Sequence, residues 1–125
     1  MIAHATLAVA DYAIAKELYR KMLAPLGYEF TDDHPEWKAD GFKESDRTSF
    51  WIGEKEKPQG SHVAFEAKNQ AEVDNFYKAA LASGGKDNGA PGYRVEYWPG
   101  YYAAFIHDAD GNNVEAVWYD YSKVK

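Results

Sequence analysis

The 125-residue sequence contains no cysteine and only two methionines. The absence of cysteine excludes disulfide bonds, a thiolate nucleophile and a thiolate metal site. No apolar run approaches the roughly 18 residues that a membrane-spanning helix needs. The first residues also lack the basic segment and apolar run of a signal peptide. We therefore expect a cytoplasmic protein with no membrane span.

Basic residues are scarce, because 14 lysines and arginines stand against 20 aspartates and glutamates, which leaves a net charge of −6. Nucleic-acid binding calls for clustered positive charge, so we exclude a nucleic-acid partner. The glycine-rich segment 84–89 follows an expected helix, whereas a phosphate-binding loop precedes one. No Gly-x-Ser-x-Gly motif indicates a serine hydrolase either.

Aromatic residues are abundant, with ten tyrosines and four tryptophans in a chain of 16% aromatic content. Such residues often line a ligand pocket or an interface. The densest aromatic segment is 91–102, which contains Tyr97, Trp98 and Tyr101 beside Arg94. We expect these residues to bind substrate, with Arg94 pairing a carboxylate or phosphate. The alternative is ordinary strand packing and a surface ion pair between Arg94 and Glu96.

The sequence repeats itself at an offset of 58 residues, because the segment from His4 aligns without a gap with the segment from His62. Each copy has the pattern of a strand, a helix-capping residue, a helix and a glycine stop. The caps are Asp11 and Asn69, and an apolar stripe of helical period follows each of them. Both copies therefore begin with the same strand–helix unit.

Strand patterns follow each expected helix. After the first helix we expect strands over about 28–33, 36–43 and 47–53. After the second helix we expect a loop over 86–92, followed by strands over 93–98, 101–107 and 112–119. Tight turns are expected at Asp40-Gly41 and Asp110-Gly111. The fold class is α+β, with two βαβββ modules, about 1–57 and 58–125, in a single domain. Because each module is too small to bury its own sheet, a pseudo-twofold axis is expected to relate them in a curved mixed sheet around a concave cleft.

His4 and His62 occupy the same position in the two modules. Strand parity places both histidines on the face opposite the apolar residues that pack against the helices, which is the concave face. Glu115 lies within an apolar strand pattern, and a partly buried carboxylate needs a partner. Two imidazoles and one carboxylate are a typical ligand set for a divalent metal. The alternatives are ordinary histidines and a solvated glutamate, and we interpret His34 and His107 as loop and turn residues.

Three segments carry a family resemblance: the opening IAHATLAVAD with its AKELYRKMLAPLGY helix, the segment SHVAFEA, and the closing FIHDADGNNVEAV. The last is similar to a family element F-x-x-D-P-D-G-N-x-x-E, with Ala109 where proline is common. Together the segments resemble the vicinal oxygen chelate superfamily, which includes glyoxalase I, extradiol dioxygenases and bleomycin-resistance proteins. The resemblance covers essentially the whole chain and indicates the fold more specifically than a reaction.

The resemblance implies a metal centre with His4, His62 and Glu115 as ligands of Fe, Mn, Ni or Zn. Glyoxalase I has a fourth ligand on the last strand of its first module. Alignment of the turns places Phe50 opposite Glu115, so no ligand occupies that position, and we count Phe50 among the substrate-binding residues. The set of two histidines and one glutamate is similar to that of extradiol dioxygenases, which are commonly longer chains.

These observations predict a glyoxalase-like metal-dependent enzyme, of lyase, isomerase or dioxygenase type, that acts on a small molecule with vicinal oxygens. Tyr101, Tyr102 and Glu66 are candidates for a general base, and none is strongly marked. The alternative is a non-catalytic small-molecule binding protein of the bleomycin-resistance type. The resemblance also implies a homodimer, and some family members complete each metal site with residues from both chains.

Overall fold

The computed structural model describes residues 2–124, so Met1 and Lys125, the ends of the expected domain, lie outside the described residues. Two α-helices and eight strands occur within this part of the chain. The first module contains β1 (Ala5–Val9), α1 (Tyr12–Leu23), a short 3₁₀ helix (Ala24–Leu26), β2 (Glu29–His34), β3 (Ala39–Lys43) and β4 (Thr48–Glu54). The second contains β5 (His62–Glu66), α2 (Gln70–Ala82), β6 (Lys86–Tyr93), β7 (Tyr101–His107), β8 (Asn113–Tyr119) and a 3₁₀ helix (Tyr121–Lys123).

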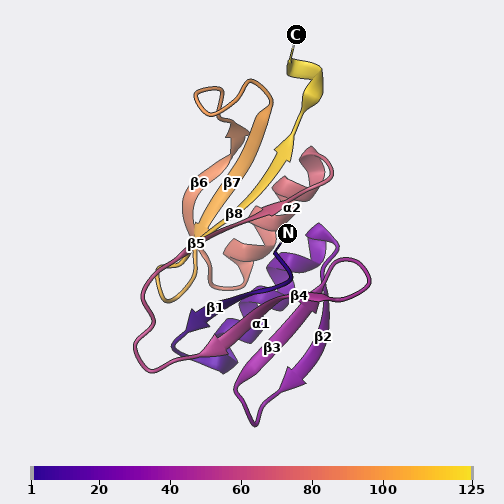
Figure 1. Cartoon of the computed structure of the whole chain (residues 1–125). Coiled ribbons are helices and arrows are strands. Elements are labelled where there is room, and N and C mark those ends of the chain that lie inside the picture. Colours follow the sequence, from indigo (N-terminus) through magenta and orange to yellow (C-terminus); the bar gives the residue numbers. More distant parts are fainter. Residues whose placement is uncertain (1, 125) are drawn as a thin grey trace.

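The strands form two four-stranded mixed sheets, ordered β1-β4-β3-β2 and β5-β8-β7-β6. In each sheet the first strand pairs in parallel with the last, and the other pairs are antiparallel. The α+β class and the two βαβββ modules are confirmed. The expected single curved sheet is corrected to two sheets, since no backbone ladder among the described residues joins β1 to β5. These two strands lie at the middle of the molecule (Figure 1).

Local capping starts both helices where the sequence predicts. The Asp11 side chain accepts a hydrogen bond from the Ile14 amide, and the Asn69 side chain accepts one from the Glu72 amide. After α1, Gly27 adopts a left-handed conformation with φ of 86°, which a glycine adopts without steric cost. The two copies therefore begin their helices by the same physical means. They end them differently, since α1 continues into the 3₁₀ helix before Gly27, whereas α2 is capped by Ser83, just before Gly84 at φ of 101°.

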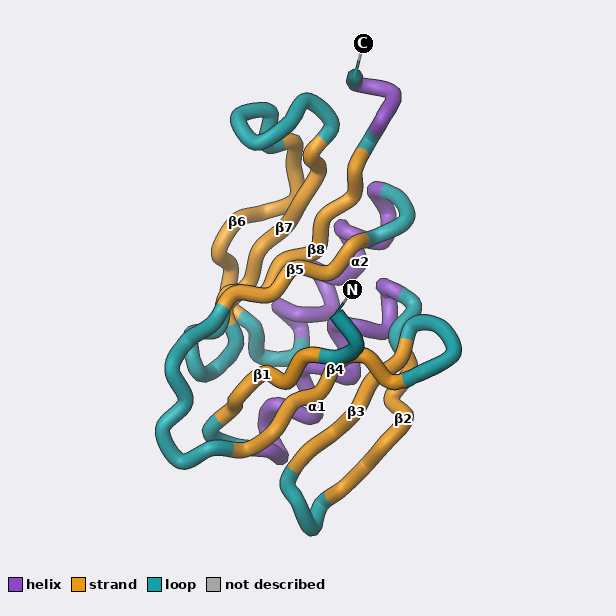
Figure 2. The backbone as a smooth tube through the Cα atoms, viewed as in Figure 1, coloured by secondary structure: helices purple, strands orange, loops and turns teal. Residues whose placement is uncertain are grey.

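The core lies between the helices and one face of each sheet. In Figure 2 both helices lie behind the strands, and α1 and α2 also pack on one another. Leu7 and Val9 of β1 and Phe65 of β5 are buried on this side. His4, Thr6, His62 and Glu66 have the opposite parity and are exposed, as expected. We call the sheet faces away from the helices the open faces.

Three segments differ from the sequence-based expectation. The predicted loop at 86–92 is strand β6, whereas the predicted strand at 93–98 is mostly a turn. Gly89, at φ of +148°, and Gly92 lie in β6 where its pairing with β7 is irregular. Glycines are typical of loops, but here they allow the strand to distort locally. The expected turn at Asp40-Gly41 lies inside β3, and the β2–β3 connection instead uses Lys38 at φ of 52°.

The turn Asp108–Asn112 holds the two modules together. The Asn112 side-chain amide donates to the Ala8 carbonyl at 3.1 Å, and its oxygen accepts from the Ser61 amide at 2.8 Å. The Tyr19 hydroxyl of α1 donates to Asp108 at 2.7 Å. Asn112 and Asp108 are both buried, so the D-x-D-G-N element of the sequence has a structural role at the junction.

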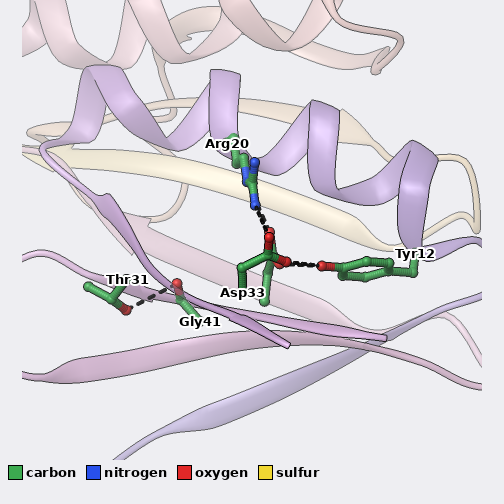
Figure 3. A network of polar contacts seen from close by, with 6 residues as sticks. Tyr12, Arg20, Thr31, Asp33 and Gly41 are labelled. Carbon is green, nitrogen blue, oxygen red and sulfur yellow. Dashed lines mark hydrogen bonds and ion pairs between the residues drawn. The ribbon is translucent and has the colours of Figure 1, made fainter. Parts of the chain in front are cut away.

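A polar network lies beneath α1 on the helix side of the first sheet (Figure 3). The Tyr12 hydroxyl lies 2.7 Å from Asp40 Oδ1 and 2.5 Å from Asp33 Oδ1. Arg20 Nε donates to Asp40 Oδ2 at 3.0 Å, and the guanidinium lies over the Phe30 ring at 3.7 Å. Burial, and then the two carboxylates, raise the pKa of Tyr12. Asp40 is fully buried, so this network provides the partners that its charge requires.

Candidate functional site

The open face of the second sheet carries a polar group at its centre. Glu115 of β8 is only 2% exposed although it lies on this face, because His62 and Tyr101 cover it. His62 Nε2 lies 3.1 Å from Glu115 Oε1, and the Tyr101 hydroxyl donates to Glu115 Oε2. Burial, followed by the bond to Glu115, raises the pKa of Tyr101. The buried carboxylate thus has partners from both neighbouring strands.

The orientation of His62 is determined by its other nitrogen. Nδ1 lies 3.1 Å from the Asn113 carbonyl oxygen, which only accepts, so Nδ1 carries the hydrogen and donates it. Contact between Nε2 and the Glu115 carboxylate then requires a proton or a metal ion between them. Two ligands bound at right angles, each about 2.1 Å from a metal, are about 3.0 Å apart. The His62–Glu115 pair therefore fits two adjacent positions of a metal ion, with the backbone anchor typical of metal-binding histidines.

His4 lies apart from this pair. It lines a groove of about 480 Å³ on the open face of the first sheet, together with Thr6, Trp37, Ala39, Thr48 and Trp51. Within residues 2–124, no three histidine, aspartate or glutamate side chains converge in a way that could hold a metal ion. A single chain thus brings together two of the three predicted ligands, and it does not complete a three-ligand site.

Strand register corrects the position of Phe50. Thr6 pairs with Trp51 in the first module, just as Ala64 pairs with Glu115 in the second. Since Thr6 and Ala64 are equivalent in the repeat, the counterpart of Glu115 is Trp51. Phe50 is 3% exposed in the core, where its ring packs against Phe65 at 4.9 Å. It does not line the open face.

The predicted aromatic residues gather around one end of the second sheet. The Tyr101 ring packs edge-on against Tyr97 at 5.3 Å and against Tyr119 at 5.5 Å. Trp98 packs against Tyr119 at 5.8 Å. Tyr97, Trp98 and Tyr101 therefore do form one aromatic wall, which begins at the Glu115 carboxylate.

Arg94 follows β6 directly and lies over the Phe105 ring at 5.4 Å. Phe105 is the β7 partner of Glu115, so the guanidinium lies above the same face as the His62–Glu115 pair. Two of its nitrogens donate to the Gly92 and Ala90 carbonyl oxygens, at 2.9 and 2.7 Å. Arg94 is thus held by the β6 backbone, and no ion pair joins it to Glu96 among the described residues.

Sequence reasoning did not identify Trp37, Trp51 or Tyr119 as site residues. The His34 ring stacks on Trp37 at 4.0 Å and on Trp51 at 6.0 Å, which turns the expected loop residue His34 into part of an aromatic stack. Once the β1–β4 register is known, strand parity places Trp51 on the open face. Trp37 lies in a connection, where no periodic signal exists.

Comparison with known proteins agrees with this architecture. The family model described as the glyoxalase/bleomycin resistance protein/dioxygenase superfamily matches residues 1–116. Among curated proteins, none matches the sequence significantly. A glyoxalase/bleomycin resistance protein from Albidiferax ferrireducens T118 is 24% identical, with 93% of this chain and 96% of that chain covered and a TM-score of 0.76. A lactoylglutathione lyase from Agrobacterium tumefaciens is 23% identical, with 94% and 92% covered and a TM-score of 0.69.

A glyoxalase-related enzyme from Fulvimarina pelagi is 15% identical and has a TM-score of 0.71, with 94% of this chain and 87% of that chain covered. At such identities these structures show a shared fold. The α-helices of residues 2–124 have 12 and 13 residues, and neither has the length and apolar character that a membrane crossing needs. Paired βαβββ modules with open sheet faces define the structural class. The chain belongs to the glyoxalase/bleomycin resistance protein/dioxygenase superfamily.

Proposed function

We propose that the protein is a metal-dependent enzyme that acts on a small molecule with vicinal oxygens, and that His62 and Glu115 hold the metal. The observation that carries this proposal is the 3.1 Å separation of His62 Nε2 and Glu115 Oε1, with Nδ1 anchored on the Asn113 carbonyl. A bound divalent ion of the Fe, Mn, Ni or Zn type would supply Lewis-acid activation of the substrate oxygens. A cytoplasmic location remains a prediction.

The chain's own residues would position the substrate around this pair. Tyr101 holds the second oxygen of Glu115, and with Tyr97 and Trp98 it offers an apolar wall. Arg94 supplies positive charge above the same face for an anionic substrate group. We propose His4 as a third ligand that a second copy of the chain provides, because His4 lies in a different groove within one chain.

Metal content tests the pair directly. We expect His62→Ala and Glu115→Gln each to weaken binding of Zn²⁺ or Mn²⁺ by more than about 100-fold. Loss of a residue that only supports a metal ligand weakens metal binding by about 10- to 100-fold, and loss of the ligand itself should weaken it more. Elemental analysis of purified protein, followed by titration with each metal, measures the effect. His34→Ala is the matched control, because His34 stacks on tryptophans of the other sheet. Unchanged metal affinity in His62→Ala would refute the proposed site.

Mixing two variants tests whether the site forms between chains. If His4 of one chain meets His62 of its partner, a mixed dimer of His4→Ala and His62→Ala chains has one site with both histidines intact and one with neither. Each variant alone should then bind little metal, whereas the refolded mixture should recover a measurable fraction of the wild-type stoichiometry. No recovery in a mixture that has formed mixed dimers contradicts a site shared between chains.

The second candidate function is non-catalytic binding of a small molecule. One observation favours it: the three predicted ligands do not converge within one chain. Under this alternative the aromatic wall and Arg94 bind the ligand, and a hydrogen bond joins His62 to Glu115 in place of a metal ion. Failure of the wild-type protein to bind Fe, Mn, Ni or Zn in the titrations above would select this alternative.

A further inference from the structure

A second pocket, of about 540 Å³, opens where the two modules meet. Its lining residues are Tyr28, Glu44, Glu66, Ala67, Lys68, Trp118, Tyr119 and Tyr121. They come from the ends of β5 and β8 and the residues that follow these strands, from the residue before β2 and from the loop after β3. This loop and the turn after β5 lie on the same side of the molecule (Figure 1). Neither His62 nor Glu115 lines it, so the pocket is distinct from the proposed metal site. Tyr119 connects the two, since it lines the pocket and packs on Tyr101 at 5.5 Å.

Four of the eight residues that line the pocket are aromatic. Trp118 and Tyr119 are half-buried, and Tyr121 is 72% exposed. Trp98 packs edge-on against both Tyr119 and Tyr121, at 5.8 and 5.2 Å, and so braces them from outside the pocket. On the opposite module, Tyr28 is held by an edge-on contact with Phe65 at 5.3 Å. The rings are thus positioned by neighbours before any ligand arrives.

The charges in the pocket are unbalanced. Lys68 Nζ lies 3.4 Å from Glu44 Oε1, so these two charges pair across the modules. The Glu66 side chain, by contrast, has no hydrogen-bond or ion-pair partner within residues 2–124. Burial raises the pKa of the neighbouring Tyr119, and the charge of Glu66 is the second cause. One negative charge therefore remains uncompensated beside aromatic rings.

We propose that this pocket binds a small alkylated ammonium ion, with Glu66 as its counter-ion and Trp118, Tyr119 and Tyr121 as its aromatic walls. The negative faces of aromatic rings attract cations whose charge is spread over methyl groups. A metal ion would instead need several oxygen ligands, and the described residues offer no such group here. The Lys68 ammonium is already paired with Glu44, so it leaves the Glu66 carboxylate to an incoming cation.

The test compares choline with 3,3-dimethyl-1-butanol, its uncharged analogue of the same shape, in the presence of a chelator. Tryptophan fluorescence and calorimetry report binding to the 125-residue chain. We expect choline to bind at least about tenfold more tightly than the alcohol, and Glu66→Gln to remove most of that preference. Glu56→Gln, which changes an exposed glutamate of the linker outside the pocket, is the matched control and should have no effect.

A gain-of-affinity variant keeps the proposal testable if Glu66→Gln disturbs folding. Lys68→Met removes the positive charge that pairs with Glu44. The pocket then carries one more unpaired negative charge, so choline should bind several-fold more tightly. Equal affinities for choline and the alcohol would overturn the proposal, as would choline binding that is insensitive to Glu66→Gln. Binding that is lost in Glu115→Gln and retained in Glu66→Gln would also overturn it, because it places the cation at the His62–Glu115 pair.

Discussion

Replacing Asp40 by alanine is expected to lower the free energy of unfolding by about 3 kcal/mol, because the change leaves buried partners without a counter-charge. Asp40 is fully buried and accepts from Arg20 Nε at 3.0 Å, and its other oxygen lies 2.7 Å from the Tyr12 hydroxyl. Asp33 is exposed and approaches Arg20 only at 3.8 Å, so it does not replace Asp40. The network connects α1 to β2 and β3, and its loss loosens the whole first module.

Denaturation by urea, followed by circular dichroism, measures this effect. Asp46→Ala in the exposed β3–β4 loop is the control, and its change should stay within about 0.5 kcal/mol. Asp40→Asn keeps one acceptor and should lie between the two. A loss below about 1 kcal/mol for Asp40→Ala would show that water or Asp33 compensates the buried groups.

Replacing Gly100 by alanine is expected to lower the free energy of unfolding by about 2 to 3 kcal/mol, since overpacking forces the backbone to move. A Cβ atom at Gly100 would lie 2.0 Å from the Asp120 carbonyl oxygen and 2.9 Å from a Trp98 ring carbon. The Gly100 carbonyl accepts from the Asp120 amide at 2.7 Å, so the two chain segments cannot separate without losing this bond. The clash is with backbone, which rotamer changes do not relieve.

Thermal unfolding compares this variant with Gly53→Ala, where the added Cβ would meet only Thr6 Cγ2 at 3.7 Å, an ordinary contact. Gly53→Ala should leave the midpoint nearly unchanged, whereas Gly100→Ala should lower it by several degrees. Equal midpoints for the two variants would contradict the close packing at Gly100. Since Trp98 adjoins this position and braces the pocket tyrosines, choline affinity should fall in Gly100→Ala as well.

The 58-residue repeat was sufficient to predict the paired modules, because the same capping residues, helical stripes and strand parity recur in both copies. Asp11 and Asn69 act locally, within three residues of their partners, so sequence alone reveals them. Parity likewise predicts that His4 and His62 lie on open faces, since alternation along a strand needs no tertiary information.

Strand identity and register depend on partners far along the chain. The glycine-rich segment 86–92 is a strand only because β7 pairs with it, and no local propensity indicates this. An alignment of turns placed Phe50 opposite Glu115. The irregularity at Phe42 and Lys43 in the β3–β4 pairing and the parallel β1–β4 ladder instead place Trp51 there.

The sequence by itself determined the fold class and the family, and it singled out His4, His62 and Glu115 as candidate ligands. Only the tertiary structure decided that His62 and Glu115 lie 3.1 Å apart, while His4 lines a separate groove of the other sheet. The sequence could not predict these distances, because a repeat specifies only which positions of the two modules are equivalent. The distance between modules depends on how α1 and α2 pack and on the buried turn at Asn112, whose bonds span more than 50 residues of the chain.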